Sequence, residues 1–254
     1  MFEMMCESLG LRNLAPSSID EPPGEADYGS MRLSSVLDGV KGHWPIATVV
    51  SCSFASYAVV AFIHRNAFDW SDPHQYWTAS FSATFLSGLA YTHFFEYGYH
   101  RLLMHHGVRG LGFTKKNHLQ HHRVFYGENF TSRNREDWEY IASPWFVFPA
   151  LLTVHYSVLQ MFLSPRSLVA FFAGVLLHYL VFECTHWLTH VEGNAVDRWI
   201  ARVPVLGRVR AYHIRHHRHH HEIPTADFNF NPPFLGDVVF GTLEVPPANA
   251  ARYS

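Results

Sequence analysis

The 254-residue sequence predicts an all-α membrane protein, with four transmembrane helices and a dimetal histidine site at one end of them. Charged residues make up only 16% of the chain, whereas soluble proteins contain about 25%. Four long apolar stretches carry no acidic or basic residue, and helices are expected there because an open strand cannot satisfy its backbone in lipid. Many of the twenty histidines recur at helical spacing, which indicates metal binding.

The four predicted spans are residues 44–63, 76–95, 142–163 and 167–182. About 20 residues cross the hydrocarbon core of a bilayer. The third stretch contains Pro144 and Pro149 near its start, and the fourth could extend from Pro165 through Cys184. Ser164-Pro165-Arg166 is predicted to be a tight turn, so the last two spans form a helical hairpin.

Four spans place residues 1–43, 96–141 and 183–254 on one side of the membrane. This side carries 17 of the 19 lysines and arginines, so the positive-inside rule makes it cytoplasmic. The expected location is therefore the endoplasmic reticulum or a bacterial inner membrane, with both termini in the cytoplasm. Residues 1–42 include a segment rich in Pro, Ser, Gly and acid and are expected to be disordered or weakly ordered. Residues 43–254 form the predicted membrane domain.

Ten histidines form four spaced motifs: HRLLMH, HLQHH, HWLTH and HIRHH. Positions i, i+3 and i+4 share one face of a helix, so each HxxHH motif is expected to direct three imidazoles at one point. Ten ligands suit two ions with four or five each. The predicted ligands are His100, His105, His118, His121, His122, His186, His190, His213, His216 and His217.

His100 and His105 are five residues apart, which is about 140° of rotation on a straight α-helix. Either they bind different ions, or the helix ends or bulges between them, as π-bulges do at functional sites. The sequence leaves both possibilities open. The neighbouring His106 and the run His219-His220-His221 are expected to be peripheral.

The ligand types favour redox-active iron. The three cysteines are scattered and form no CxxC pair, so thiolates are not expected at the site. An all-nitrogen, ligand-rich pair of sites at a membrane surface fits two iron ions that react with O2 better than structural zinc, although a purified sample could hold zinc instead. The net charge of −2 gives no sign of nucleic-acid binding.

Four residues near the motifs are candidates to hold the second ring N–H of a ligating histidine, as carboxylates often do. They are Glu96, Glu183, Asp227 and Asn229. His93 and His178 lie inside predicted spans, where a polar side chain is costly and often functional. A hydrogen bond between helices is the commoner explanation for such residues.

The four histidine motifs, in this order, resemble those of the fatty acid hydroxylase and sterol desaturase superfamily of integral-membrane dimetal oxidases. The resemblance covers roughly residues 80–245, including Phe240-Gly-Thr. It implies four transmembrane helices under a cytosolic helical cap, and a di-iron centre whose ligands fall on the ten histidines named above. It also implies the use of O2 and reducing equivalents.

The resemblance implies a monooxygenase that hydroxylates an unactivated C–H bond of a bilayer lipid of fatty acyl, sterol or carotenoid type. No HPGG haem-binding signature occurs, so electrons are expected from a separate cytochrome b5-, ferredoxin- or reductase-type protein. A desaturase with the same di-iron centre is the alternative. A metal transporter and a non-catalytic membrane scaffold are more remote alternatives, because the motifs lie on one side of the membrane and all ten ligand positions are present.

Overall fold

A computed structural model describes residues 44–243 apart from positions 70, 73, 75–77, 126–129, 133, 192–198, 200–201, 204–206, 208–209, 211, 215 and 218–226. Within this part of the chain the structure is helical and contains no β-strand, and a single isolated bridge joins Ser132 to Val191. The predicted all-α class is confirmed for these residues. The predictions for residues 1–42 and for His219-His220-His221 lie outside them.

Among the described residues, two helices are long and apolar enough to cross a membrane. Helix α3 spans Trp44–Ile63, which coincides with the first predicted stretch, and helix α8 spans Pro165–His190. Large apolar side chains of α3, such as Phe54 and Phe62, are more than half exposed, which suits lipid better than water. Helix α8 continues past the predicted end at Cys184, so the HWLTH motif forms its last turns.

The other two predicted spans do not form helices that are both long and apolar enough to cross a membrane. Helix α4, Ala79–Gly98, has membrane length but contains several hydroxyl residues, His93 and Glu96, and it does not reach the same apolarity. Helix α7 spans only Val147–Leu159, about 20 Å against a hydrocarbon core of about 30 Å. It begins after Pro144, with Pro149 in its first turn, where no N–H is needed. Two of the four predicted spans are therefore confirmed as membrane-length apolar helices.

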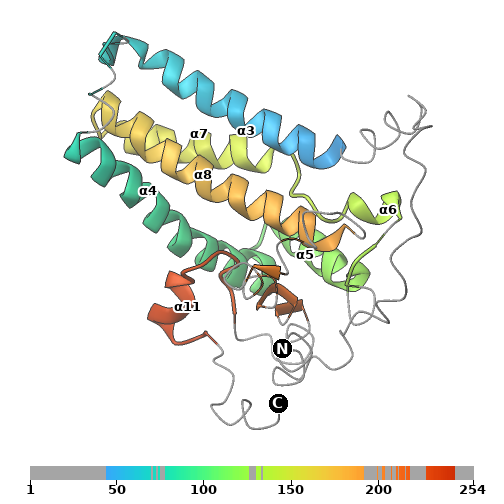
Figure 1. Cartoon of the computed structure of the whole chain (residues 1–254). Helices are drawn as coiled ribbons and strands as arrows, with labels where there is room; N and C mark the ends of the chain where they lie inside the picture. Colours follow the sequence, from blue (N-terminus) through green and yellow to red (C-terminus); the bar gives the residue numbers. More distant parts are fainter. Residues whose placement is uncertain are drawn as a thin grey trace.

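Helices α4 and α8 pack side by side with their backbones in close approach (Figure 1). A Cβ atom added at Gly88 would lie 2.2 Å from the carbonyl oxygen of Phe171, and one at Gly174 would lie 2.3 Å from that of Phe85. Small residues allow such contacts between membrane helices. This packing fixes the position of the HWLTH motif relative to the end of α4.

The turns at one end of the helices lie together, as the predicted topology requires. Ser164 caps α8 by accepting the N–H of Ser167, and Pro165 occupies the first helical position. Arg166 Nε donates to the carbonyl of Ala67, in the short helix η3 (Arg65–Ala67) after α3, at 2.5 Å.

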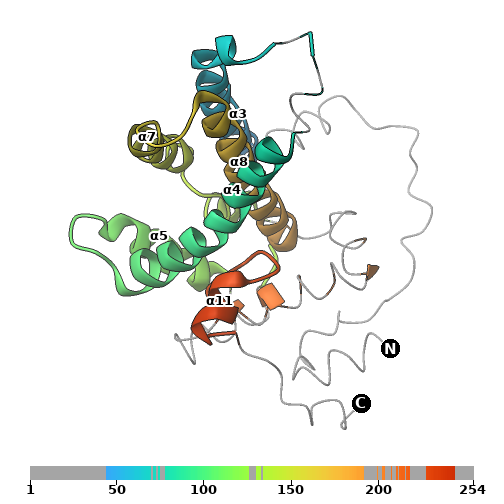
Figure 2. The ribbon, with the colours of Figure 1, turned by 90° about the vertical axis from the view of Figure 1, so that its left-hand side faces the viewer.

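The opposite end carries the remaining elements, as Figures 1 and 2 show. The π-helix η5 (Tyr99–His106) continues directly from α4, and α5 (Gly112–Val124) follows it. The short helices α6 (Arg135–Trp138) and α11 (Leu235–Phe240) complete this end. All four histidine motifs therefore lie at the same end of the helices.

Candidate metal centre

The structure brings all ten predicted histidines into one region. Helix η5 supplies two of them, α5 three, the end of α8 two, and the helical residues around 212–217 the last three. Seven of the ten are buried, and the three half-buried ones are His100, His105 and His118. His106 is exposed and donates to or accepts from no other histidine in the described chain; its Nδ1 bonds the carbonyl of Arg101.

The first group, here the α8 cluster, consists of His121, His186, His190, His213 and His217. One ring nitrogen from each of His121, His186, His190 and His217 lies within 4.8 Å of the others. The Nε2 atom of His121 is 3.1 Å from that of His186 and 3.2 Å from that of His217. His213 joins the group through His190, because their Nε2 atoms are 2.9 Å apart.

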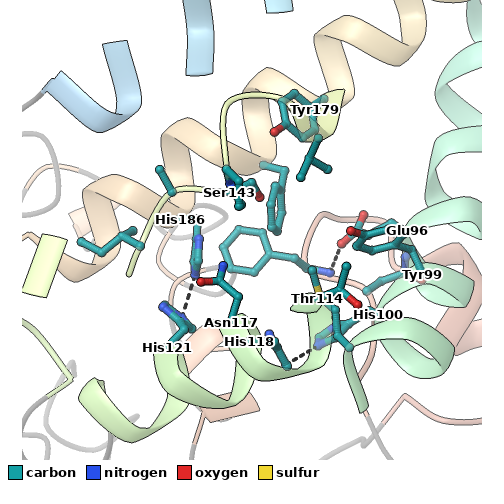
Figure 3. Close-up of a pocket in the computed structure, with 18 of the residues that line it drawn as sticks. Glu96, Tyr99, His100, Thr114, Asn117, His118, His121, Ser143, Tyr179 and His186 are labelled. Carbon is teal, nitrogen blue, oxygen red and sulfur yellow. Dashed lines mark hydrogen bonds between the residues drawn. The ribbon is translucent and has the colours of Figure 1, made fainter. Parts of the chain in front are cut away.

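The second group, here the η5 cluster, consists of His100, His105, His118, His122 and His216. His118 is common to two sets of three that could each hold an ion. Its Nε2 atom is 3.1 Å from the Nε2 atoms of both His100 and His105 (Figure 3 shows the first of these contacts). The ten histidines thus divide into two groups of five.

Each HxxHH motif is divided between the two clusters, so the structure does not direct all three of its imidazoles at one point. In the second motif, His118 and His122 belong to the η5 cluster and His121 to the α8 cluster. The fourth motif divides the same way, with the i+3 residue His216 apart from His213 and His217. The reason is that adjacent positions such as 121 and 122 point about 100° apart on a helix.

The π-helix resolves the five-residue spacing of the first motif. Its hydrogen bonds join residues five apart, and Gly107 N–H closes it by donating to Leu102 O at 2.9 Å. His100 and His105 therefore lie on the same face, with ring centroids 4.9 Å apart. Of the two possibilities left open by the sequence, the bulged helix is the one observed.

Main-chain carbonyls orient the imidazoles. The Nδ1 atoms of five histidines bond carbonyl oxygens at 2.6 to 2.9 Å, and a carbonyl can only accept, so each Nδ1 must carry the proton. A neutral ring has one such proton, which leaves a bare lone pair at Nε2. The pairs are His100–Phe228, His121–Tyr140, His190–Phe130, His216–Asp227 and His217–Phe125.

The contact between His121 and His217 shows why the region fits a metal. Both rings carry their proton on Nδ1, yet their Nε2 atoms face each other at 3.2 Å. Two bare lone pairs repel unless a cation lies between them. Ligand nitrogens bound to a first-row metal at about 2.0 to 2.1 Å are about 2.9 to 3.4 Å from one another, which matches the observed separations.

Burial keeps the imidazoles neutral. Desolvation lowers the pKa of His121 to about 4 and, with neighbouring imidazoles, holds the pKa of His118 and His217 well below the usual 6.5. Neutral imidazole is the form that binds metal. The rings are therefore ready to bind at neutral pH without first releasing a proton.

The two predicted glutamates bond groups other than the ten histidines. Glu96 pairs with His178 at 2.7 Å and accepts the N–H of Phe230, while Glu183 accepts the N–H of Ser143 at 3.2 Å. Asp227 contributes through its carbonyl to His216, and Asn229 donates to the carbonyl of His93 at 2.7 Å. Carbonyls replace the expected carboxylates because turns of the folded chain point backbone oxygens at the rings.

Asp237 is the supporting residue that sequence reasoning missed. Its fully buried carboxylate accepts the N–H groups of Phe228 at 2.8 Å and Asn229 at 2.5 Å, and the hydroxyl of Thr242 at 2.7 Å. It thereby holds the turn whose carbonyls orient His100 and His216. The available signal was a single acid at the start of an otherwise apolar segment.

A cavity of about 150 Å³ joins the two clusters (Figure 3). Eight of the ten histidines line it, so both clusters face the same space. Its remaining wall is mainly apolar and includes Phe95, Phe113, Leu151, Phe182 and Phe230. Of the aromatic residues near the motifs, Phe95, Tyr99 and Tyr140 line the cavity, whereas Phe94, Trp145 and Phe146 are exposed.

Comparisons with protein-family models, with curated proteins and with solved structures return no match.

Proposed function

We propose that this protein is a membrane-bound dimetal monooxygenase that inserts one oxygen atom of O2 into an unactivated C–H bond of a lipid. The observation that carries the proposal is the shared cavity: nitrogen donors from two five-histidine clusters meet an apolar wall there. Metal-binding nitrogens beside an apolar space are the arrangement expected for oxidation of a substrate that has no polar group at the reacting carbon. The resemblance of the four motifs to the membrane hydroxylase superfamily points the same way.

Two iron ions held by these clusters would supply the reductive activation of O2. The protein residues hold the site in shape: the carbonyls of Tyr140, Phe125 and Phe228 fix the rings of His121, His217 and His100, so that each presents Nε2. The second oxygen atom leaves as water, and a separate electron-donor protein provides the two electrons that this balance requires.

The apolar wall positions the substrate and excludes water. Leu151 of α7, Phe95 of α4 and Phe182 of α8 enclose the cavity on the side of the helices. A volume of about 150 Å³ accommodates a short run of methylene groups rather than a whole lipid. The reacting segment of a fatty acyl, sterol or carotenoid substrate would lie there while the rest stays among the helices.

The membrane arrangement belongs to the same proposal. Helices α3 and α8, with α4 and α7 beside them, form a four-helix anchor, and η5, α5 and α11 form the cap on the cytoplasmic side. A lipid tail would enter from the bilayer, and the electron donor would dock on the basic cytoplasmic side.

The test is a product assay on the purified full chain, loaded with Fe²⁺ and supplied with a reductant, a donor protein, a lipid extract and ¹⁸O2. Mass spectrometry is expected to show lipids that have gained one ¹⁸O atom. His118→Ala and His121→Ala, one from each cluster, should abolish the product, whereas His64→Ala, far from the clusters, should not. Products that have lost two hydrogens would indicate a desaturase, and absence of both products with every lipid class would refute the proposal.

A further inference from the structure

A third group of metal-ligating side chains lies between α4 and α8, apart from both histidine clusters. His93 and Glu96 are three residues apart on α4 and share a face, and His178 faces them from α8. Glu96 Oε2 is 2.7 Å from His178 Nε2, and the two imidazole rings are 4.4 Å apart and nearly perpendicular. One ligand atom from each of the three residues lies within 4.8 Å of the other two.

The group is buried and one of its nitrogens is unsatisfied. His93 is 6% exposed, and its Nδ1 has no hydrogen-bond partner within the described part of the chain. The side chains of His178 and Glu96 are 5% and 14% exposed. His155, another histidine among the helices, differs because its Nδ1 bonds the carbonyl of Leu151. A hydrogen-bonded Glu96–His178 pair explains two members of the group but leaves the His93 nitrogen unexplained.

Outer contacts hold the side chain of Glu96 and the main chain at His178 in place. The second carboxylate oxygen of Glu96 accepts the N–H of Phe230, and the Nδ2 group of Asn231 lies 3.3 Å from the carbonyl of His178. Ligands of protein-bound metals are commonly fixed by such contacts. The loop formed by residues 227–231 therefore supports this group as well as the η5 cluster.

We propose that His93, Glu96 and His178 bind a third divalent transition-metal ion. Two imidazole nitrogens and one carboxylate oxygen are a donor set typical of zinc and of non-haem iron. An ion there would bind one ring nitrogen of His93 and replace the proton between Glu96 and His178, which would be released to water. Glu96 and His178 also line the cavity, so the open positions of the ion would face it.

This site is separate from the proposed dimetal centre. His178 precedes His186 by eight residues, roughly 12 Å along α8. Its ligand set contains a carboxylate, whereas the two clusters contain only histidines. The inference does not depend on oxygenase activity.

The experiment measures metal content of the full chain in detergent. The protein is stripped with a chelator, loaded with Zn²⁺ alone, freed of excess ion and analysed by mass spectrometry for zinc per chain. Wild type is expected to hold three ions, and His93→Ala and Glu96→Gln two each. His155→Ala is the matched control, because it removes a histidine that lies among the helices but outside the group. This variant should retain three ions.

The outcomes separate this inference from the proposed function. Two ions in wild type, lost in His121→Ala or His118→Ala but not in His93→Ala, would overturn the third site and leave the dimetal centre intact. One ion per chain in wild type, lost only in His93→Ala, would support the third site and refute the proposed dimetal centre. If His93→Ala fails to fold, the zinc content of Glu96→Gln and of wild type tests whether the third site exists. Three ions retained by Glu96→Gln would also count against the site.

Discussion

The carboxylate of Asp237 accepts the main-chain N–H of Asn229 at 2.5 Å and thereby fixes the turn around residues 227–229. The carbonyls of this turn orient two histidines of the η5 cluster, His100 and His216. One buried acid thus links helix α11 to two histidines of the η5 cluster.

We expect Asp237→Asn to weaken the η5 cluster more than the α8 cluster. The amide turns one acceptor into a donor, which would face a buried N–H group, at a cost of about 1–3 kcal/mol. Metal analysis should find at least one ion fewer than in wild type. Asp69→Asn, in the exposed turn after α3, is the control and should not change the content. Full occupancy in Asp237→Asn would show that the turn does not support the ligands.

The end of the π-helix provides a second prediction. Gly107 has a φ of +76°, and a Cβ there would lie 3.0 Å from Lys115 Cδ. Alanine at this position is strained by about 1–3 kcal/mol. Gly107→Ala should therefore lower the thermal stability and loosen the pairing of His100 with His105, reducing metal content. A Cβ atom at Gly112 would meet nothing within 4 Å, so Gly112→Ala should behave as wild type. Equal effects of the two substitutions would show that the backbone at Gly107 is not strained by alanine.

Helix packing gives a third prediction. Gly88→Ala places a methyl group 2.2 Å from a backbone oxygen of α8, which a side-chain movement cannot relieve. We expect a loss of about 1–3 kcal/mol, measured by thermal unfolding in detergent. Gly98→Ala, on the same helix, meets nothing within 4 Å and should be neutral or slightly stabilising. The close approach of α4 and α8 would be in doubt if Gly88→Ala were as stable as Gly98→Ala.

Acid should destabilise the metal-free protein. Burial lowers the folded pKa of His121 to about 4, below its ordinary 6.5, so between these values the unfolded chain binds a proton that the folded chain excludes. The stabilisation is complete above pH 6.5 and falls by on the order of 3 kcal/mol as the pH approaches 4. Denaturant titrations at pH 7.5 and 5 should show the loss, and His121→Gln should reduce it. A pH-independent stability would contradict a buried, neutral site.

Much of the helical framework followed from the sequence. The first span was predicted with its bounds as Trp44–Ile63, and α8 begins at Pro165, the earlier of the two starts considered for the fourth span. The third span was predicted too long, because apolar residues around Pro144 read as helix but lie in the turn before α7. Hydropathy records which residues avoid water, not whether their backbone is helical.

For the site, the sequence identified the ten histidines but not their grouping or their support. The sequence does not indicate which cluster His121 and His122 each join, or that Phe228 and Tyr140 provide the orienting carbonyls. The grouping His93, Glu96 and His178 also depends on how α4 meets α8.

The sequence by itself determined that eight of the ten imidazoles recur at α-helical spacing beside apolar helices, because the period of a helix is a local property of the backbone. Only the tertiary structure decided how those imidazoles divide into two clusters and which nitrogen each presents. Those features depend on contacts between residues such as His100 and Phe228, which are 128 positions apart, and such contacts are set by the packing of the whole chain.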